Sequence, residues 1–302
     1  MKIILRLLIA IACVASVHAQ YFSDTPDADA FVGAGLPTLN YGADSLLSVS
    51  GSNATNVLGV KEGLSDSFIR FNTAALIISF NSRYGSNNWV VTHAALQLTE
   101  QGAPTNSIFN RGIGTFQVRW IANNNWSEGT GTSIVPTTDG ISYNSEAGLL
   151  NSSTDEVLGT FTNSGANQLL FFYLATPPRF VKAVKAGAEV GLYLTATSPN
   201  TGFTFDSREF ATNSDWPFLV IAAVPQAAII GVHPSGNNIL LTCTNGAADQ
   251  TYYTMMSTNV SLPLYKWLPV ATNHLSSSGN FSITVTNGAV GLGSKYFTLQ
   301  TQ

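Results

Sequence analysis

Residues 24–51, DTPDADAFVGAGLPTLNYGADSLLSVSG, decide the fold. Strand-like residues at 30–32 and 46–49 enclose a middle section that is rich in turn formers. Glycine, proline and asparagine between two apolar runs are typical of a connection between strands. The stretch therefore predicts two short strands at the start of a sheet. Its turn formers are Gly33, Gly35, Pro37, Asn40 and Gly42.

Apolar and polar residues alternate with a period of two through much of the remaining chain. Because side chains two apart in a strand point to the same face, this pattern is typical of half-buried strands. Residues 168–174, QLLFFYL, lack the alternation, so we expect that strand to be covered on both faces. The clearest alternating segments are residues 68–71, 90–99, 113–121 and 190–196.

Helical spacing is prominent at two places. Residues 74–84 follow Thr73, a candidate cap, and precede Gly85, a candidate left-handed terminator. Residues 177–186 begin with two prolines and carry an apolar stripe that ends before a glycine. The sequence therefore predicts an all-β protein: a jelly-roll-like β-sandwich with two short helices, followed by a smaller all-β domain.

The chain divides into three predicted parts. Residues 1–19 combine Lys2 and Arg6 with an apolar run and a small-residue cleavage site, as a signal peptide does. Residues 20–225 form the sandwich, and residues 226–302 contain five further strand-like segments, one of them at 263–267. We therefore expect a secreted, extracellular protein with no membrane span in the mature chain. The periplasm and the cell surface are alternative locations.

The composition disfavours two classes of function. The chain has 17 acidic and 13 basic residues without basic runs, whereas nucleic-acid binding needs clustered Lys and Arg. No G-x-S-x-G, H-E-x-x-H or phosphate-binding loop is present, so we expect no enzyme. A pair of carboxylates for glycoside hydrolysis remains an alternative. Cys243 lies in an apolar run and is expected to be a buried hydrophobe.

Residues 122–149 are polar, irregular and long for a connection, which favours a functional loop. Trp126 offers an indole for stacking on a sugar ring, and Glu128 offers a carboxylate for its hydroxyl groups. Alternatively, Trp126 plugs the sandwich while Glu128 holds the amides of the following turn. Tyr143 in the same loop and Tyr41 in the other long turn complete a predicted ligand platform.

Two sets of charged residues, one around Arg208 and one of three aspartates, each have two possible roles. Alternation places Asp206 and Arg208 on one strand face, as in a solvated ion pair worth ~0.2–1 kcal/mol. Alternatively, the Arg208 guanidinium binds the carboxylate of an acidic sugar. Asp24, Asp27 and Asp29 lie close together in the sequence, and oxygen ligands suit Ca²⁺. A structural calcium ion and plain solvation of this turn are both open, and no other cofactor is predicted.

Four motifs are distinctive: residues 24–51, SFIRF at 67–71, WSEGT at 126–130, and FDSRE at 205–209 with WPFL at 216–219. They resemble those of the DNRLRE family, secreted bacterial β-sandwich domains like carbohydrate-binding modules, some of which bind polysaccharides. The C-terminal pattern of STN, LP, KW, PVATN, GNF and YFTLQ resembles a module on secreted proteins of the Verrucomicrobia. The first resemblance implies a sandwich fold and a polysaccharide ligand.

Together these observations predict a secreted, non-catalytic protein that binds extracellular polysaccharide, or a cell-surface component, through loops at one end of the sandwich. A structural or adhesive surface protein without a small ligand is one alternative, and a polysaccharide-degrading enzyme is another. The predicted ligand-binding residues are Tyr41, Trp126, Glu128, Tyr143 and Arg208.

Overall fold

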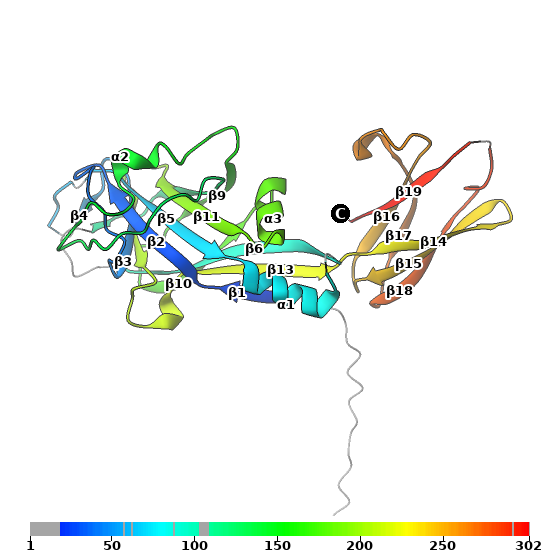
Figure 1. Cartoon of the computed structure of the whole chain (residues 1–302), viewed down its shortest axis with the longest axis horizontal. Coiled ribbons are helices and arrows are strands. Elements are labelled where there is room, and N and C mark those ends of the chain that lie inside the picture. The colour runs from blue at the N-terminus through cyan, green and yellow to red at the C-terminus, as the bar shows by residue number, and fades with distance from the viewer. Residues whose placement is uncertain are drawn as a thin grey trace, which may run out of the picture. The chain divides into compact units, whose positions relative to one another are not determined.

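A computed structural model describes residues 19–56, 58–61, 63–86, 88–102, 109–291 and 293–301 (Figure 1). Nearly all of the predicted signal peptide, residues 1–18, lies outside the described residues. The described chain forms two compact units. The first contains residues 20–87 and 91–223, and the second contains residues 88–90 and 224–302.

The first unit is built on a large antiparallel sheet with strand order β1-β13-β6-β12-β3-β5-β11-β8-β9, and β10 and β2 pair with β6 and β5. The ring centroid of Phe116 in β8 lies 4.7 Å from that of Phe203 in β12, although these strands are not neighbours in the sheet. The sheet therefore closes over an aromatic core as a sandwich, which confirms the predicted all-β class. Its strands are β1 (Gln20–Asp24), β2 (Pro26–Gly33), β3 (Leu46–Ser50), β5 (Ser65–Asn72), β6 (Trp89–Glu100), β8 (Thr115–Ile121), β9 (Glu156–Thr162), β10 (Gln168–Leu174), β11 (Glu189–Ala196), β12 (Gly202–Asp206) and β13 (Phe218–Pro225).

Residues 24–51 form two strands, β2 and β3, as their turn formers predict. The strands β2 and β3 each pair with β5 rather than with one another: Ala30 lies opposite Phe68, and Ser50 lies opposite Ser65. The connection between β2 and β3 carries Asn40, whose amide is fully buried. A separate short pair consists of β4 (Thr55–Asn56) and β7 (Asn110–Arg111).

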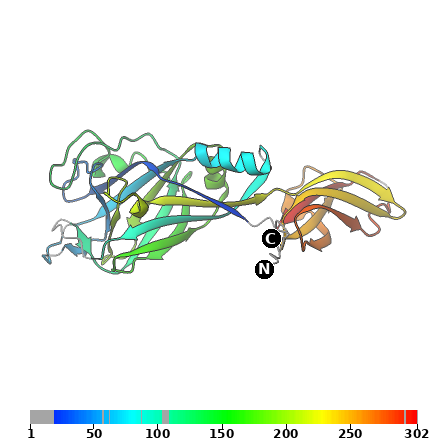
Figure 2. The same ribbon diagram turned by 90° about the horizontal axis from the view of Figure 1, so that it is seen from below.

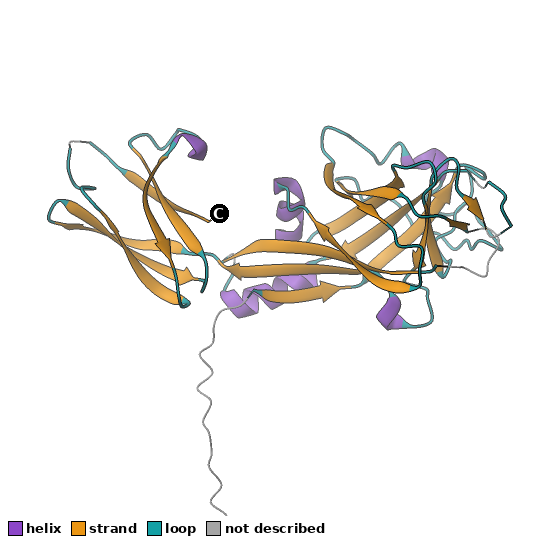
Figure 3. Cartoon of the chain, turned by 180° about the vertical axis from the view of Figure 1, so that it is seen from behind, coloured by secondary structure: helices purple, strands orange, loops and turns teal. Residues whose placement is uncertain are grey.

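Three α-helices occur among the described residues, and Figure 3 shows how little of the fold they occupy. Two match the predictions, α1 (Ala74–Tyr84) and α3 (Pro178–Lys185), whereas the single-turn α2 (Tyr143–Glu146) was not predicted. Thr73 is the N-cap residue of α1, as predicted, but its hydroxyl makes no capping bond and donates instead to the carbonyl oxygen of Ala188. Gly85 has φ 87° and ψ 154°, so it ends α1 outside the left-handed helical region.

The prediction for QLLFFYL is wrong in one respect. In β10 the burial alternates, with Phe172 and Leu174 buried and Phe171 and Tyr173 exposed by 49 % and 75 %. The strand pairs with β6, and its outer side chains remain in contact with solvent. A strand without an apolar and polar alternation can therefore still have one open face.

The second unit contains two three-stranded antiparallel sheets, β14-β15-β18 and β17-β16-β19 (Figure 2). Residues 263–267 do not form the predicted strand, because Leu264–Lys266 is a short 3-10 helix. Cys243 is buried as expected, and burial raises the pKa of its thiol to about 11. The strands are β14 (Ala228–Ser235), β15 (Asn238–Gly246), β16 (Thr251–Ser257), β17 (Leu268–His274), β18 (Gly279–Val285) and β19 (Tyr296–Thr301).

Within the described residues, no helix has both the length and the apolar character that crossing a bilayer requires.

Candidate functional site

Residues 122–149, hereafter the long loop, form most of the connection from β8 to β9, and a buried amide contacts them at three places. The Asn40 side chain donates to the carbonyl oxygens of Glu128, at 2.6 Å, and Ile141, at 2.9 Å. Its Oδ1 accepts the backbone N–H of Gly131 at 3.3 Å. Because these bonds join residues about 90 to 100 positions apart, Asn40 fixes the path of the loop against the sandwich.

Trp126 is a core residue. Its side chain is 8 % exposed, and its ring centroid lies 5.9 Å from that of Phe68. The guanidinium carbon of Arg70 lies 5.1 Å from the same indole centroid, in the range of a cation–π contact. The expectation of an open stacking platform at Trp126 is therefore wrong, and the indole plugs the sandwich beneath the long loop.

The two predicted tyrosines also pack inward. Tyr41 is 7 % exposed and stacks on Phe31, with ring centroids 4.6 Å apart and planes 8° apart. Tyr143 begins α2 and packs, partly buried, against the same apolar cluster as Trp126. The structure thus brings Tyr143 and Trp126 together around a core cluster, whereas Tyr41 belongs to a different aromatic stack.

Glu128 and Arg208 form a two-pronged ion pair. The Arg208 Nε and Nη2 groups donate to Glu128 Oε1 and Oε2, each at 2.7 Å. Arg208 Nε also lies 3.0 Å from Oε1 of Glu209. The predicted Asp206–Arg208 pair is wrong, because Asp206 accepts a hydrogen bond from Gln101 instead. The Arg208 fork, considered above as a carboxylate-binding group for an acidic sugar, is engaged by the protein's own carboxylate.

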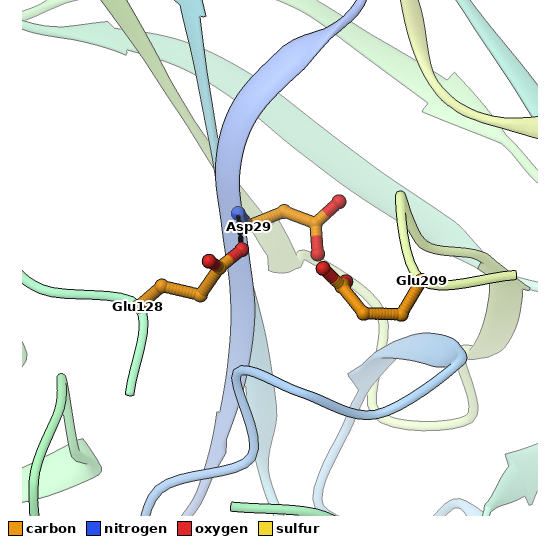
Figure 4. Close-up of side chains that lie close together, drawn as sticks. All are labelled: Asp29, Glu128 and Glu209. Carbon is orange, nitrogen blue, oxygen red and sulfur yellow. Dashed lines mark hydrogen bonds between the residues drawn. The ribbon is translucent and has the colours of Figure 1, made fainter. Parts of the chain in front are cut away.

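Asp29 completes this cluster from β2 (Figure 4). It is fully buried, its N–H donates to Glu128 Oε1 at 2.7 Å, and its Oδ2 accepts the N–H of Arg208 at 2.9 Å. Burial, followed by the charge of Glu209, raises the pKa of Asp29 well above its usual value. Burial and the charge of Glu128 raise the pKa of Glu209 to about 7. Among the described residues, this is the one group of three or more His, Cys, Asp or Glu side chains that converges closely.

The three aspartates considered for calcium have separate partners. Asp24 accepts the N–H of Thr25, and Asp27 pairs with Arg70 at 3.2 Å. An irregularity in the register of β2, between Pro26 and Ala28, lies beside Asp27. Asp27 is consequently exposed, whereas Asp29 is buried, so the structure does not gather the three carboxylates into one site.

Two open grooves flank residues 123–126. The first has a volume of about 650 Å³, and the second of about 460 Å³. They share Asn123, Asn125 and Trp126 as a common wall. Arg70 and Glu189 line the first, while hydroxyl, amide and carboxylate side chains line much of the second. Of the residues shared by the two grooves, Asn123 and Asn125 are exposed, whereas Trp126 is buried.

Two further carboxyl groups are buried, that of Glu146 in the long loop and that of Asp66 in β5. Glu146 of α2 is 9 % exposed, and burial together with the charge of Asp66 raises its pKa to about 8. Asp66 itself has a raised pKa because it is buried, although hydrogen bonds from Thr195 and Tyr193 oppose that shift. Glu146 is therefore mostly protonated at neutral pH.

Comparisons with known proteins give distant similarities. No protein-family model matches the chain, and no curated protein matches it either. Among solved structures, a β-glucuronidase from Ruminococcus gnavus, in complex with an N1-substituted uronic isofagomine, is similar at 8 % identity and a TM-score of 0.24. The similarity covers 89 % of this chain and 40 % of that one. A β-D-glucuronidase from Dictyoglomus thermophilum is similar at 7 % identity and a TM-score of 0.22, over 93 % of this chain and 43 % of that one.

The chain thus spans about two fifths of the length of these glucuronidases. Because both TM-scores are low, the similarities show neither a shared fold nor a shared activity.

Proposed function

We propose that the protein is an extracellular, non-catalytic polysaccharide-binding protein, and that its ligand lies in the two grooves beside residues 123–126. The observation that carries this proposal is the pair of adjoining, polar-lined grooves on either side of one exposed segment. A sugar chain has many hydroxyl groups, and each hydroxyl group both donates and accepts hydrogen bonds. Asparagine side chains offer both functions in return.

The rigidity of the loop supports this proposal. Binding is weakened when a loop must first be ordered, so a pre-formed loop retains more of its interaction energy. Asn40 fixes the long loop from within, and the Glu128–Arg208 pair fixes it from the side. The segment 123–125 is therefore presented on an ordered support.

The carboxylate cluster supports a non-catalytic protein over a glycoside hydrolase. A hydrolase needs two carboxyl groups that reach a bound sugar. Here Glu128 and Glu209 both bind one guanidinium, Asp29 is fully buried, and none of the three lines either groove. Each groove is lined by a single carboxylate, Glu189 in the first and Asp139 in the second, rather than by a pair.

We also infer that the first unit is a domain of the DNRLRE type. Three of the motifs that carry this resemblance supply Asp29, Glu128, Arg208 and Glu209, which meet in one cluster. A shared cluster is a reason for such distant motifs to occur together. The resemblance supports an extracellular location and a polysaccharide ligand.

Affinity electrophoresis of the purified protein in gels containing neutral and acidic polysaccharides tests the function. We expect at least one polysaccharide to retard migration while its reducing ends stay constant over time. Migration that is unchanged in every gel would favour a structural or adhesive role. Reducing ends that accumulate in proportion to the protein concentration would instead establish a hydrolytic enzyme.

A further inference from the structure

The cluster of Asp29, Glu128, Glu209 and Arg208 has an unbalanced charge. Three carboxylates converge, with one oxygen of each within 4.8 Å of the others, and one guanidinium contacts two of them. Burial removes much of the solvent that would otherwise stabilise these charges, since Asp29 is 0 % exposed and the Glu128 side chain is 18 % exposed. With all groups ionised, the cluster keeps an excess of two negative charges.

A second observation concerns hydrogen bonding. Oδ1 of Asp29 and Oε2 of Glu209 are both buried, and neither has a hydrogen-bond partner among the described residues. Figure 4 shows these two carboxyl groups pointing toward each other. Buried carboxylate oxygens are normally paired with donors or metal ions, because an uncompensated buried charge is costly. The two carboxyl groups thus converge on a position that calls for a positive species.

We propose that this position binds one divalent hard cation, Ca²⁺, with Asp29 and Glu209 as ligands and Glu128 completing the carboxylate set. Ca²⁺ takes oxygen ligands at about 2.3–2.6 Å, so ligand oxygens within 4.8 Å of one another fit around one ion. The two positive charges of Ca²⁺ balance the two excess negative charges of the cluster. Glu128 can contribute although Arg208 occupies it, because each carboxylate oxygen has more than one acceptor direction.

The proposed ion joins three distant parts of the first unit. Asp29 belongs to β2, Glu128 to the long loop, and Glu209 to the connection between β12 and β13. An ion bound between them would fasten the base of the long loop to the sandwich. This inference does not depend on polysaccharide binding, and it differs from the sequence-based grouping of Asp24, Asp27 and Asp29.

Calcium titration of the chelator-treated full-length protein tests the site. We expect one Ca²⁺ per chain with a Kd of about 0.1–1 mM, the range of extracellular calcium modules. At ten times the Kd, the melting temperature should rise by about 3–6 °C. Mg²⁺ should bind more weakly, since it demands a closer octahedral set of ligands.

Variants locate the ion. Glu209→Gln removes a charged ligand from a partly exposed side chain, and it should weaken calcium binding by more than roughly tenfold. Glu189→Gln is the matched control, because Glu189 is an exposed carboxylate that lies 3.9 Å from Arg70 and belongs to the groove rather than the cluster. It should bind calcium as the wild type does.

One alternative is a proton shared between Asp29 and Glu209. In that case calcium would leave the wild-type melting temperature unchanged, and that result would overturn the proposal whether or not Glu209→Gln folds. Calcium binding that Glu209→Gln retains in full would also overturn it, since the ion would then bind elsewhere.

Discussion

The long loop contains two neighbouring segments with different roles. Residues 123–125 face the grooves, whereas residues 126–128 anchor the loop to the sandwich. Asn123 and Asn125 are exposed and line both grooves. Trp126 is packed in the core, and Glu128 is tied to Arg208 and to the backbone of Asp29. The large aromatic and the charged residue therefore anchor the loop, while the exposed amide of Asn125 remains for a ligand.

The difference between the two segments follows from what each side chain contributes to the free energy of folding. Burying an indole gains a large apolar area, and a fork-shaped ion pair satisfies several donors at once. Asn123 holds the loop locally, since its Oδ1 accepts the N–H of Asn125 at 3.0 Å and its amide donates to the carbonyl oxygen of Gly148 at 3.4 Å. The exposed side chain of Asn125 is the one offered to a ligand. If the division is correct, changes at the anchoring residues should lower stability, whereas a change at Asn125 should alter binding alone.

The largest expected effect is that of Trp126→Ala. Removing a buried tryptophan leaves a cavity and should lower the free energy of unfolding by about 3–5 kcal/mol. Chemical denaturation of the variant and the wild type measures this change. A loss below about 1 kcal/mol would mean that the indole is not part of the core, and the division between the two segments would fail.

Glu146 is a further anchoring residue of the long loop, and its burial predicts a pH dependence of stability. Its pKa of about 8 exceeds the ordinary value of 4.5, so the folded state holds the proton more tightly than the unfolded state. This contribution to stability is complete below pH 4.5 and declines as the pH rises to about 8, by on the order of 2–4 kcal/mol. Glu146→Gln should remove that decline.

Unfolding free energies at pH 5 and pH 8 check this prediction for both proteins. Asp206, whose pKa burial raises to about 7, adds a decline of the same sign in each. The difference between wild type and variant is therefore the informative quantity. An equal decline in both proteins would show that Glu146 is ionised without cost.

A smaller effect is expected from Arg208→Lys, which keeps the charge and removes the planar fork. One ammonium nitrogen cannot reproduce the two parallel bonds that two guanidinium nitrogens donate to Glu128, so stability should fall by about 1–2 kcal/mol. Arg83→Lys on the exposed side of α1 is the control and should stay within about 0.5 kcal/mol. Equal stability of the two variants would mean that the fork does not anchor the loop.

The strands could be predicted because their information is local. Alternation over a few residues indicates a half-buried strand, and Phe116, Val118 and Trp120 are buried on one face of β8 as that pattern requires. The exception was β10, where Phe171 and Tyr173 are apolar but exposed. Hydrophobicity alone does not tell whether a second layer covers a face.

The candidate site could be predicted only in part. Glu128 and Arg208 were both selected, but separately, since the pairing of residues 80 positions apart depends on the tertiary fold. Asn40 was read as a turn former, and no local pattern reveals that its amide reaches Ile141. Trp126 was ambiguous because a tryptophan beside polar residues fits a sugar platform and a core plug equally well.

The smallest expected change in stability is at the exposed segment. Asn125→Ala should alter the free energy of unfolding by less than about 0.5 kcal/mol, because the side chain is exposed. Denaturation under the conditions used for Trp126→Ala provides the comparison. A loss as large as that of Trp126→Ala would mean that Asn125 is itself an anchoring residue.

The affinity of Asn125→Ala for the polysaccharide that most retards the wild type tests the central claim most directly. Asn213→Ala, a change at an exposed asparagine outside both grooves, is the matched control. Losing one asparagine's hydrogen bonds to a sugar should raise the Kd roughly tenfold. The proposed site predicts that loss for Asn125→Ala, with unchanged melting temperature and an unaffected Asn213→Ala. Equal affinity of wild type and Asn125→Ala would contradict it.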